Sequence, residues 1–259
     1  MCERSGGAAM LQACLNGGRM KADAPGVPIT PEELAADAAA ARAAGADELH
    51  LHPRGADGAE SLAPGDVGAA IAAVRAAAPG MPVGVGTGAW IAPGGRARLA
   101  HIAGWETLAP ASRPDYASVN AHEEDAAEVM AILDRLGVRV EAGIWTPAAA
   151  ERFLVMRAAP PPLRILVEMT SDDADEARRI AQETIARLRA AHVAGETPPP
   201  ILLHGQGGSV WPMLRMAKAA GYDTRIGFED GLALPEGGRA QSNSALVAAA
   251  AALMAAPAE

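Results

Sequence analysis

Short apolar runs alternate along the chain with longer segments in which apolar residues recur at helical spacing. The short runs predict strands, and the longer, alanine-rich segments predict helices. We expect strands at 10–16, 47–52, 81–88, 115–120, 138–144, 163–169, 200–205 and 224–229. We expect helices at 31–45, 66–80, 94–105, 123–137, 146–159, 173–195, 211–221 and 239–255.

The first of these helices has a well-marked start and end. Thr30 suits the N-cap, Pro31 suits the first helical position, and Glu33 completes a capping box with Thr30. Gly45 then predicts the end of the helix, because glycine readily adopts the left-handed conformation that closes many helices.

Eight strand–helix units in 259 residues predict an α/β fold, and specifically a single (β/α)8 TIM barrel domain over 1–259. The strands are mostly apolar, as strands buried on both faces of a parallel sheet should be. A doubly wound open sheet is the alternative, but it more often carries a nucleotide-binding glycine motif. The stretch GQGGSV at 205–210 is only a loose match to such a motif.

Composition and charge argue against several classes of protein. The net charge of −9 argues against a nucleic-acid partner, because an acidic surface repels phosphate backbones. Cys2 and Cys14 are the only cysteines, so we expect no disulfide framework and a reducing cytoplasm. The first residues do not resemble a signal peptide, and the apolar stretch near the end is too short and alanine-rich for a membrane span.

His50 and His52 are the first candidates for chemistry. They stand two residues apart in the second predicted strand, so their side chains share one face. Strand ends at the carboxyl face of a barrel carry the active site. Two imidazoles there suit a zinc-like ion that keeps one position open for catalysis, although strand histidines also occur without a metal.

The last predicted strand supplies candidates for a third ligand and for acid–base chemistry. Glu229 and Asp230 follow an apolar run, and Arg225 precedes them. The eighth strand of a closed barrel lies one strand from the histidine pair, so Glu229 could complete a His-His-Glu set. Arg225 could pair with Asp230 or bind a substrate carboxylate. An adjacent acidic pair in a solvated loop is the alternative.

Two segments together resemble a known family. They are PITPEELAADAAAARAAGADELHLHPR at 28–54 and TRIGFEDGLALPEGGRAQSNSALV at 224–247. These resemble the β-keto acid cleavage enzymes, whose type activity is cleavage of 3-keto-5-aminohexanoate. The resemblance covers most of the chain and implies a zinc-dependent (β/α)8 barrel. Such enzymes transfer an acetyl unit between a β-keto acid and a coenzyme A thioester, which gives acetoacetate and a new acyl-CoA.

The resemblance also implies roles for individual residues. His50, His52 and Glu229 would be the metal ligands, and Asp230, supported by Arg225, would be the acid–base residue. Further residues would contact substrate: Thr87, Ser118, Asn120 and Glu141. We also expect a homo-oligomer, either a dimer or a tetramer.

The loop after the first strand departs from the family pattern. The family has an acidic residue there that suits the amine of the type substrate, whereas this chain has Gly18, followed by Arg19 and Lys21. This favours substrates with a neutral or anionic tail, with Glu141 as the first alternative acid if a cationic tail is preferred. The seventh strand brings His204 and Gln206, which are unusually polar for that position.

Three functions are therefore compatible with the residues. The first is a coenzyme A-dependent β-keto acid cleavage enzyme. The second is another metal-dependent keto-acid lyase or aldolase on a barrel, acting without coenzyme A. The third is a metal-containing binding protein that has lost catalysis. The barrel alone does not separate them.

Overall fold

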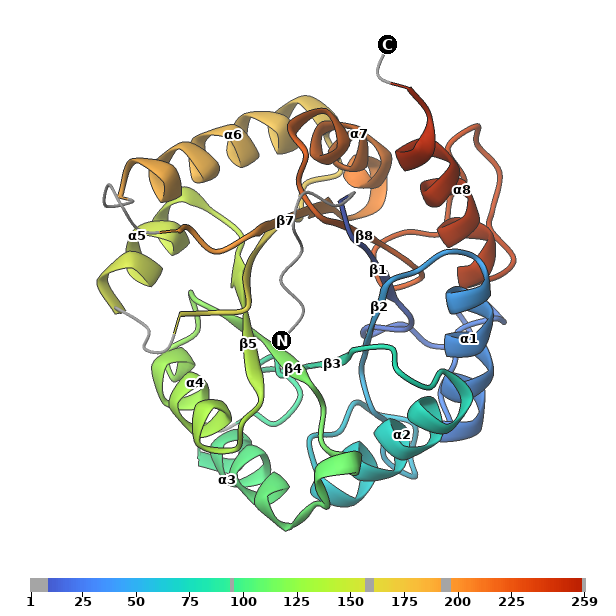
Figure 1. Ribbon diagram of the computed structural model, residues 1–259, viewed down its shortest axis with the longest axis vertical. Coiled ribbons are helices and arrows are strands. Elements are labelled where there is room, and N and C mark those ends of the chain that lie inside the picture. The colour runs from blue at the N-terminus through green and yellow to red at the C-terminus, as the bar shows by residue number, and fades with distance from the viewer. Residues whose placement is uncertain (1–8, 94–95, 157–160, 192–196, 258–259) are drawn as a thin grey trace.

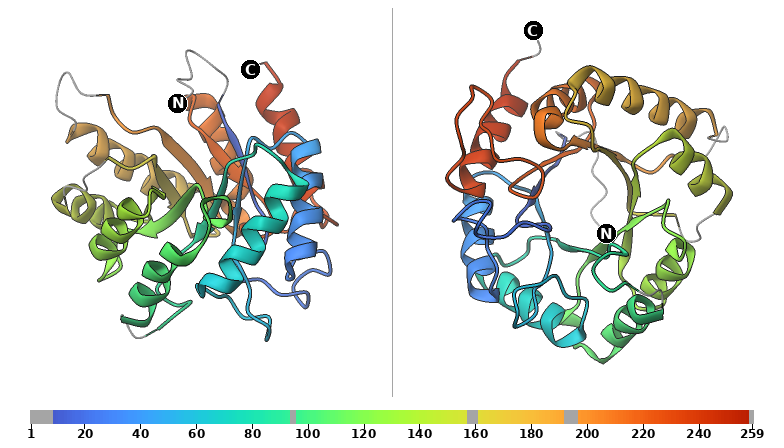
Figure 2. Two further views of the ribbon diagram at one scale, coloured as in Figure 1. Left: turned by 60° about the horizontal axis from the view of Figure 1, so that its bottom comes forward. Right: turned by 180° about the vertical axis from the view of Figure 1, so that it is seen from behind.

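The computed structural model describes residues 9–93, 96–156, 161–191 and 197–257. Within these ranges, eight parallel strands form a nearly closed barrel that is surrounded by eight helices (Figure 1). The views from the side and from behind show the same ring of helices outside the strands (Figure 2). The expected (β/α)8 barrel is therefore confirmed. None of the helices in the described ranges combines the length and apolar character that a membrane span requires.

The strands follow one another around the barrel in chain order. They are β1 (Leu11–Cys14), β2 (Glu48–Leu51), β3 (Val83–Gly86), β4 (Tyr116–Asn120), β5 (Arg139–Ile144), β6 (Arg164–Met169), β7 (Ile201–Gly205) and β8 (Thr224–Ile226). Each strand from β1 to β6 pairs with the next, and β8 pairs with β1. A parallel bridge between Leu202 and Asp223 brings β7 and β8 together at the remaining seam.

Each helix predicted from the sequence is present, with ends that shift by a few residues. The helices are α1 (Pro31–Ala43), α2 (Pro64–Ala77), α3 (Arg96–Gly104), α4 (Ala126–Arg135), α5 (Pro147–Met156), α6 (Ala174–Ala190), α7 (Val210–Ala220) and α8 (Asn243–Ala255). The predicted helical residues 94–95, 157–159 and 192–195 lie outside the described ranges. The capping box of α1 is confirmed, because Thr30 Oγ1 accepts from the Glu33 amide and Glu33 accepts from the Thr30 amide.

The last strand is shorter than the sequence predicted. β8 ends at Ile226 rather than at residue 229, because the chain turns at Gly227. The carbonyl of Gly227 accepts from the amides of Asp230 and Gly231, which closes the turn. Consecutive residues of a strand point to opposite faces, whereas consecutive residues of a turn can face the same group. This turn is therefore what allows Glu229 and Asp230 to share one partner.

Alternate strand residues build two cores. Residues such as Leu49, Val85 and Ile165 face the helices in the large apolar core between barrel and helix ring. Inside the barrel, Met10, Leu166 and Leu202 form a separate small apolar cluster. The inner cluster is therefore limited in area, and much of the barrel interior is polar.

A charged layer crosses the barrel near the amino-terminal ends of the strands. Arg164 of β6 pairs with Glu48 of β2 and, at 2.8 Å, with Glu141 of β5. Gln12 of β1 donates to Glu141 and to the hydroxyl of Tyr116. The guanidinium of Arg164 also lies 5.1 Å from the centre of the Tyr116 ring. Two buried carboxylates thus share one buried guanidinium.

Arg164→Met tests how much the barrel depends on this layer. The substitution removes the guanidinium that pairs with both Glu48 and Glu141, so we expect the free energy of unfolding to fall by about 3–5 kcal/mol. Urea denaturation followed by circular dichroism measures it. Arg178→Met is the control, because Arg178 pairs with Asp175 on the exposed surface of α6 and should change the midpoint little. Equal midpoints for the two variants would contradict the account.

Candidate active site and metal centre

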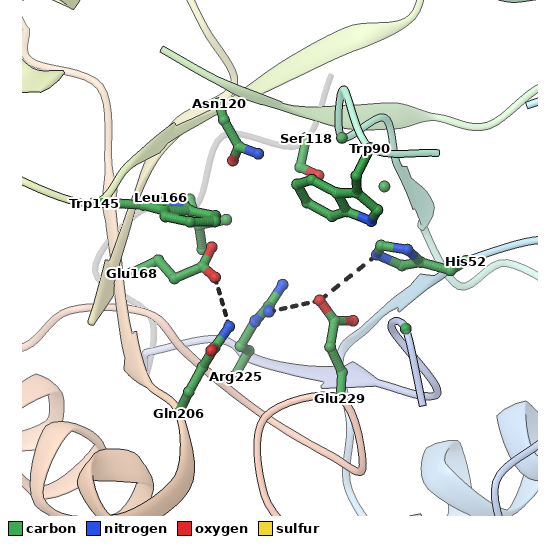
Figure 3. A pocket seen from close by; sticks show the side chains of 13 residues that line it. His52, Trp90, Ser118, Asn120, Trp145, Leu166, Glu168, Gln206, Arg225 and Glu229 are labelled. Atoms are coloured by element: carbon green, nitrogen blue, oxygen red, sulfur yellow. Dashed lines mark hydrogen bonds and ion pairs between the residues drawn. The ribbon is translucent and has the colours of Figure 1, made fainter. Parts of the chain in front are cut away.

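A pocket of about 290 Å³ opens at the carboxyl ends of the strands. Residues at the ends of most of the eight strands contribute to its wall. They include His52, Ser118, Asn120, Glu168, Arg225 and Glu229 (Figure 3). This is the end of a (β/α)8 barrel at which active sites form.

The structure brings the three predicted metal ligands together at one side of this pocket. The Nε2 atoms of His50 and His52 lie 3.2 Å apart. Glu229 Oε2 is 3.7 Å from His50 Nε2, and Glu229 Oε1 is 3.6 Å from His52 Nε2. One ligand atom from each residue fits within a span of 4.8 Å. The three residues therefore converge as the sequence predicted.

These distances fit a small divalent cation. Tetrahedral zinc with Zn–N bonds of 2.0–2.1 Å requires a separation of about 3.3 Å between two ligand nitrogens. Without a cation, Glu229 Oε2 is a buried carboxylate oxygen with no hydrogen-bond partner among the described residues. The donor set of two imidazoles and one carboxylate is also one that zinc prefers in catalytic sites.

The pKa values of the two histidines are shifted in opposite directions. Burial lowers the pKa of His50 to about 3, although Glu229 acts in the opposite direction. Burial also disfavours the charged form of His52, but Glu229 and Glu60 outweigh it and raise the pKa to about 9. Burial raises the pKa of Glu229, but Arg225 and the two histidines hold it well below its usual range. A metal ion bound here would therefore replace the extra proton that the raised pKa assigns to His52.

Side chains of the β1–α1 loop fix the backbone beside His52. The Asn16 side chain accepts from the His52 amide at 2.8 Å and donates to the His52 carbonyl at 2.8 Å. Arg54, which follows His52 and Pro53, donates to the carbonyls of Gly17 and Arg19. The polar end of the HLHPR segment therefore ties the histidine strand to the neighbouring loop.

Two glycines are needed for the ligands to approach. Gly17 has a φ of +52°, and a Cβ atom there would lie 2.3 Å from Glu229 Cγ. A Cβ atom on Gly86 would lie 2.2 Å from His52 Nε2. Any side chain at either position would displace a ligand, so both residues are explained by the packing of the site.

Glu60 is a contributor that the sequence did not reveal. Its carboxylate contacts His52 Nδ1 and also accepts from Trp90 Nε1 at 3.2 Å. A carboxylate on the second nitrogen of a ligand histidine fixes the ring and its tautomer. Glu60 lies in a loop eight residues after His52, and no pattern in the sequence marks it.

Arg225 lies between the pocket and Asp230. Its guanidinium donates to both oxygens of Asp230, at 2.7 and 3.0 Å, and to Glu229 Oε1 at 2.9 Å. Asp230 is fully buried and also contacts Cys14 Sγ and His204 Nδ1. Burial raises the pKa of Asp230, but Arg225 and His204 lower it to about 2. The predicted pair of Arg225 and Asp230 is therefore present, with the arginine on the pocket side.

Of the other four predicted substrate contacts, two line the pocket and two do not. Ser118 and Asn120 of β4 line the pocket. Thr87 is fully buried, and its hydroxyl donates to the Ser118 carbonyl at 2.5 Å, so it supports the wall from behind. Glu141 lies in the charged layer of the barrel with Arg164 and is fully buried outside the pocket wall. Its position does not support a contact with substrate.

The cations of the β1–α1 loop also face away from the pocket. Arg19 donates to the carbonyl of Phe228, and Lys21 pairs with Glu33 on the exposed side of α1. Neither residue lines the pocket. The sequence interpretation in which they meet an anionic substrate tail is therefore not supported by their positions.

A second carboxylate enters the pocket from β6. Glu168 accepts from Gln206 Nε2 at 2.8 Å, and its other oxygen lies 3.7 Å from His204 Nε2. A signal for Glu168 was present in the sequence, because an acidic residue interrupts the apolar run RILVEM. Of the two residues that the sequence singled out as unusually polar, Gln206 lines the pocket and His204 contacts Glu168 and Asp230.

Two solved structures of ObcA are similar to this barrel. ObcA in a ternary complex with a C4-CoA adduct and oxalate is 19% identical over 89% of this chain and 64% of that chain, with a TM-score of 0.68. ObcA with oxaloacetate is 19% identical over 86% and 62%, with a TM-score of 0.65. This chain thus spans less than two thirds of ObcA.

A third structure shares the barrel over almost its whole length. The 3-hexulose-6-phosphate synthase of Salmonella typhimurium is 15% identical over 95% of this chain and 98% of that chain, with a TM-score of 0.56. Identities this low show a shared fold and do not show a shared activity.

The family model for beta-keto acid cleavage enzymes matches residues 9–257. The match includes the histidine pair of β2 and the turn after β8, which form the candidate metal centre. The chain belongs to the beta-keto acid cleavage enzyme family.

Proposed function

We propose that this protein is a zinc-dependent β-keto acid cleavage enzyme that uses a coenzyme A thioester as cosubstrate. The observation that carries the proposal is the cluster of His50, His52 and Glu229 at a pocket that Arg225 also lines. Family membership supports the β-keto acid substrate. The complexes of ObcA with oxaloacetate and with a C4-CoA adduct support a keto acid and a coenzyme A derivative as the pair of ligands.

The proposed reaction balances without any further reactant. A β-keto acid R–CO–CH2–COO⁻ and acetyl-CoA give acetoacetate and R–CO–S–CoA. The bond between C2 and C3 of the keto acid and the thioester C–S bond break. A bond from C2 to the acetyl carbonyl carbon and a new thioester bond form. No net proton is consumed.

The position of each pocket residue determines the role that we propose for it. His50, His52 and Glu229 would hold the zinc ion, and bound zinc would polarise the keto group as a Lewis acid. Arg225 presents a guanidinium to the pocket, where it stabilises negative charge on the reacting oxygens. Ser118 and Asn120 orient the substrate by hydrogen bonds.

Asp230 is the proposed acid–base residue. Its Oδ1 accepts from Arg225 Nη2, so the pair presents a protonated nitrogen to the pocket with an ionised carboxylate behind it. In the proposed step a proton leaves C2 of the keto acid and passes through Arg225 to the Asp230 carboxylate, which later returns it to C2 of acetoacetate. The homo-oligomeric state and the cytoplasmic location expected from the sequence stay predictions.

A requirement for acetyl-CoA tests the proposed function. A panel of β-keto acids is incubated with the zinc-loaded protein, and acetoacetate is measured with and without acetyl-CoA. We expect acetoacetate only when acetyl-CoA is present. Cleavage of the keto acid at an equal rate without any thioester would favour a lyase that does not use coenzyme A. Ligand binding without turnover would favour a binding protein.

Metal content tests the ligand set. We expect about one divalent ion per chain by elemental analysis of the purified protein, and zinc as that ion. His50→Ala and His52→Ala should each lower the occupancy strongly, because an imidazole supplies one of only three protein ligands. His101→Ala is the matched control, because His101 lies on α3, outside the pocket. Full occupancy in the His50 and His52 variants would exclude this site.

Asp230→Asn tests the acid–base assignment. The amide keeps the shape of the side chain but cannot accept a proton, so kcat should fall roughly a hundredfold or more while zinc remains bound. Asp134→Asn, a change of the same kind on the exposed side of α4, should leave kcat unchanged. A value within a few-fold of the parent for Asp230→Asn would assign the role to another residue.

A further inference from the structure

Glu168 stands on the side of the pocket opposite the candidate metal ligands. Figure 3 shows Glu168 and Gln206 across the cavity from His52, with Arg225 between the two sides. Leu166 and Glu168 are alternate residues of β6, and both line the pocket. A β-keto acid whose keto and carboxylate oxygens faced His52 and Glu229 would therefore extend its tail towards Glu168.

One oxygen of Glu168 has unused capacity to accept hydrogen bonds. Gln206 Nε2 donates to Oε1 at 2.8 Å. His204 Nε2 forms an ion pair with Oε2 at 3.7 Å, which is too long for a hydrogen bond. Glu168 is only 6% exposed, so water reaches it poorly except from the pocket. The second oxygen therefore favours a hydrogen-bond donor on the ligand, because a buried polar oxygen without a donor costs free energy.

The pocket wall offers no comparable partner for an anionic tail. Among the thirteen residues that line it in the described part of the chain, Arg225 is the only lysine or arginine. Its guanidinium is already engaged by Glu229 and Asp230. A tail carboxylate near Glu168 would instead meet a like charge. Trp145 and Leu166, which also line this side, supply apolar surface for the methylene groups of a tail.

We propose that Glu168 and Gln206 form a tail-binding subsite that selects β-keto acids with a positively charged, hydrogen-bond-donating tail such as a primary ammonium group. This inference rests on the proposed function and adds the class of substrate to it. It reverses the tail preference that the loop at 16–23 suggested. The acid that pairs with the cation comes from β6 rather than from that loop or from Glu141.

The test compares four β-keto acids of equal length that differ only in the tail group: ammonium, hydroxyl, methyl or carboxylate. We expect the parent enzyme to use the ammonium acid about 10- to 100-fold better than the methyl acid in kcat/KM, the range expected for hydrogen bonds to a charged group. Glu168→Gln should remove most of that preference, with a much larger fall in kcat/KM for the ammonium acid than for the methyl acid. Glu124→Gln, a change of the same kind on an exposed side chain outside the pocket, should keep the parent order.

Calorimetric binding of the same four acids to the zinc-loaded protein gives the order of tails without turnover. Tightest binding of the ammonium acid, lost in Glu168→Gln, supports the subsite. Best use or tightest binding of the methyl or carboxylate acid by the parent would overturn it. An equal loss for all four acids in Glu168→Gln would also overturn it, because Glu168 would then act only through the structure of the site.

Failure of the proposed function has a different signature. In that case no acid of the panel yields acetoacetate with acetyl-CoA, whatever the order of binding. The order of tails measured by calorimetry still decides whether Glu168 selects a cation.

Discussion

The guanidinium of Arg225 holds together the two carboxylates on which the site depends. Glu229 and Asp230 are adjacent in the chain. Asp230 is fully buried and the side chain of Glu229 is 13% exposed, so the like charges repel strongly in a poorly solvated environment. Arg225 reaches both of them, which keeps both ionised. His204 adds a contact to Asp230 at 3.2 Å, whereas Glu229 Oε2 has no hydrogen-bond donor in the described part of the chain. This oxygen beside His50 and His52 favours a divalent cation where the imidazoles converge.

The turn after β8 makes this arrangement possible, and its position was not predictable from the apolar pattern. The sequence predicted the eight strand–helix units, the capping box of α1 and the shared face of His50 and His52, because each depends on local spacing. It extended β8 to residue 229, because Phe228 continues the apolar run and one glycine does not prove a turn. The structure ends the strand at Ile226, and the change brings Glu229 and Asp230 to one side of Arg225.

Contacts between distant segments account for what the sequence did not reveal. Glu60 reaches His52 from one loop, and Asn16 holds the backbone of His52 from the β1–α1 loop. Glu141 was expected at the pocket, but Arg164 binds it in the charged layer below. Its strand position alone could not show how deep in the barrel it lies. Glu168 stands four residues after Arg164 on the same strand and reaches the pocket, so depth along the barrel separates a structural acid from a candidate substrate contact.

Isotope tracing tests the central claim of carbon–carbon bond exchange most directly. The zinc-loaded protein is incubated with an unlabelled β-keto acid and acetyl-CoA labelled with ¹³C at both acetyl carbons, and the products are followed by NMR spectroscopy. The account predicts that the label appears at C3 and C4 of acetoacetate and that the new acyl-CoA carries none. Label in the acyl group of the new thioester, or unlabelled acetoacetate, would contradict it.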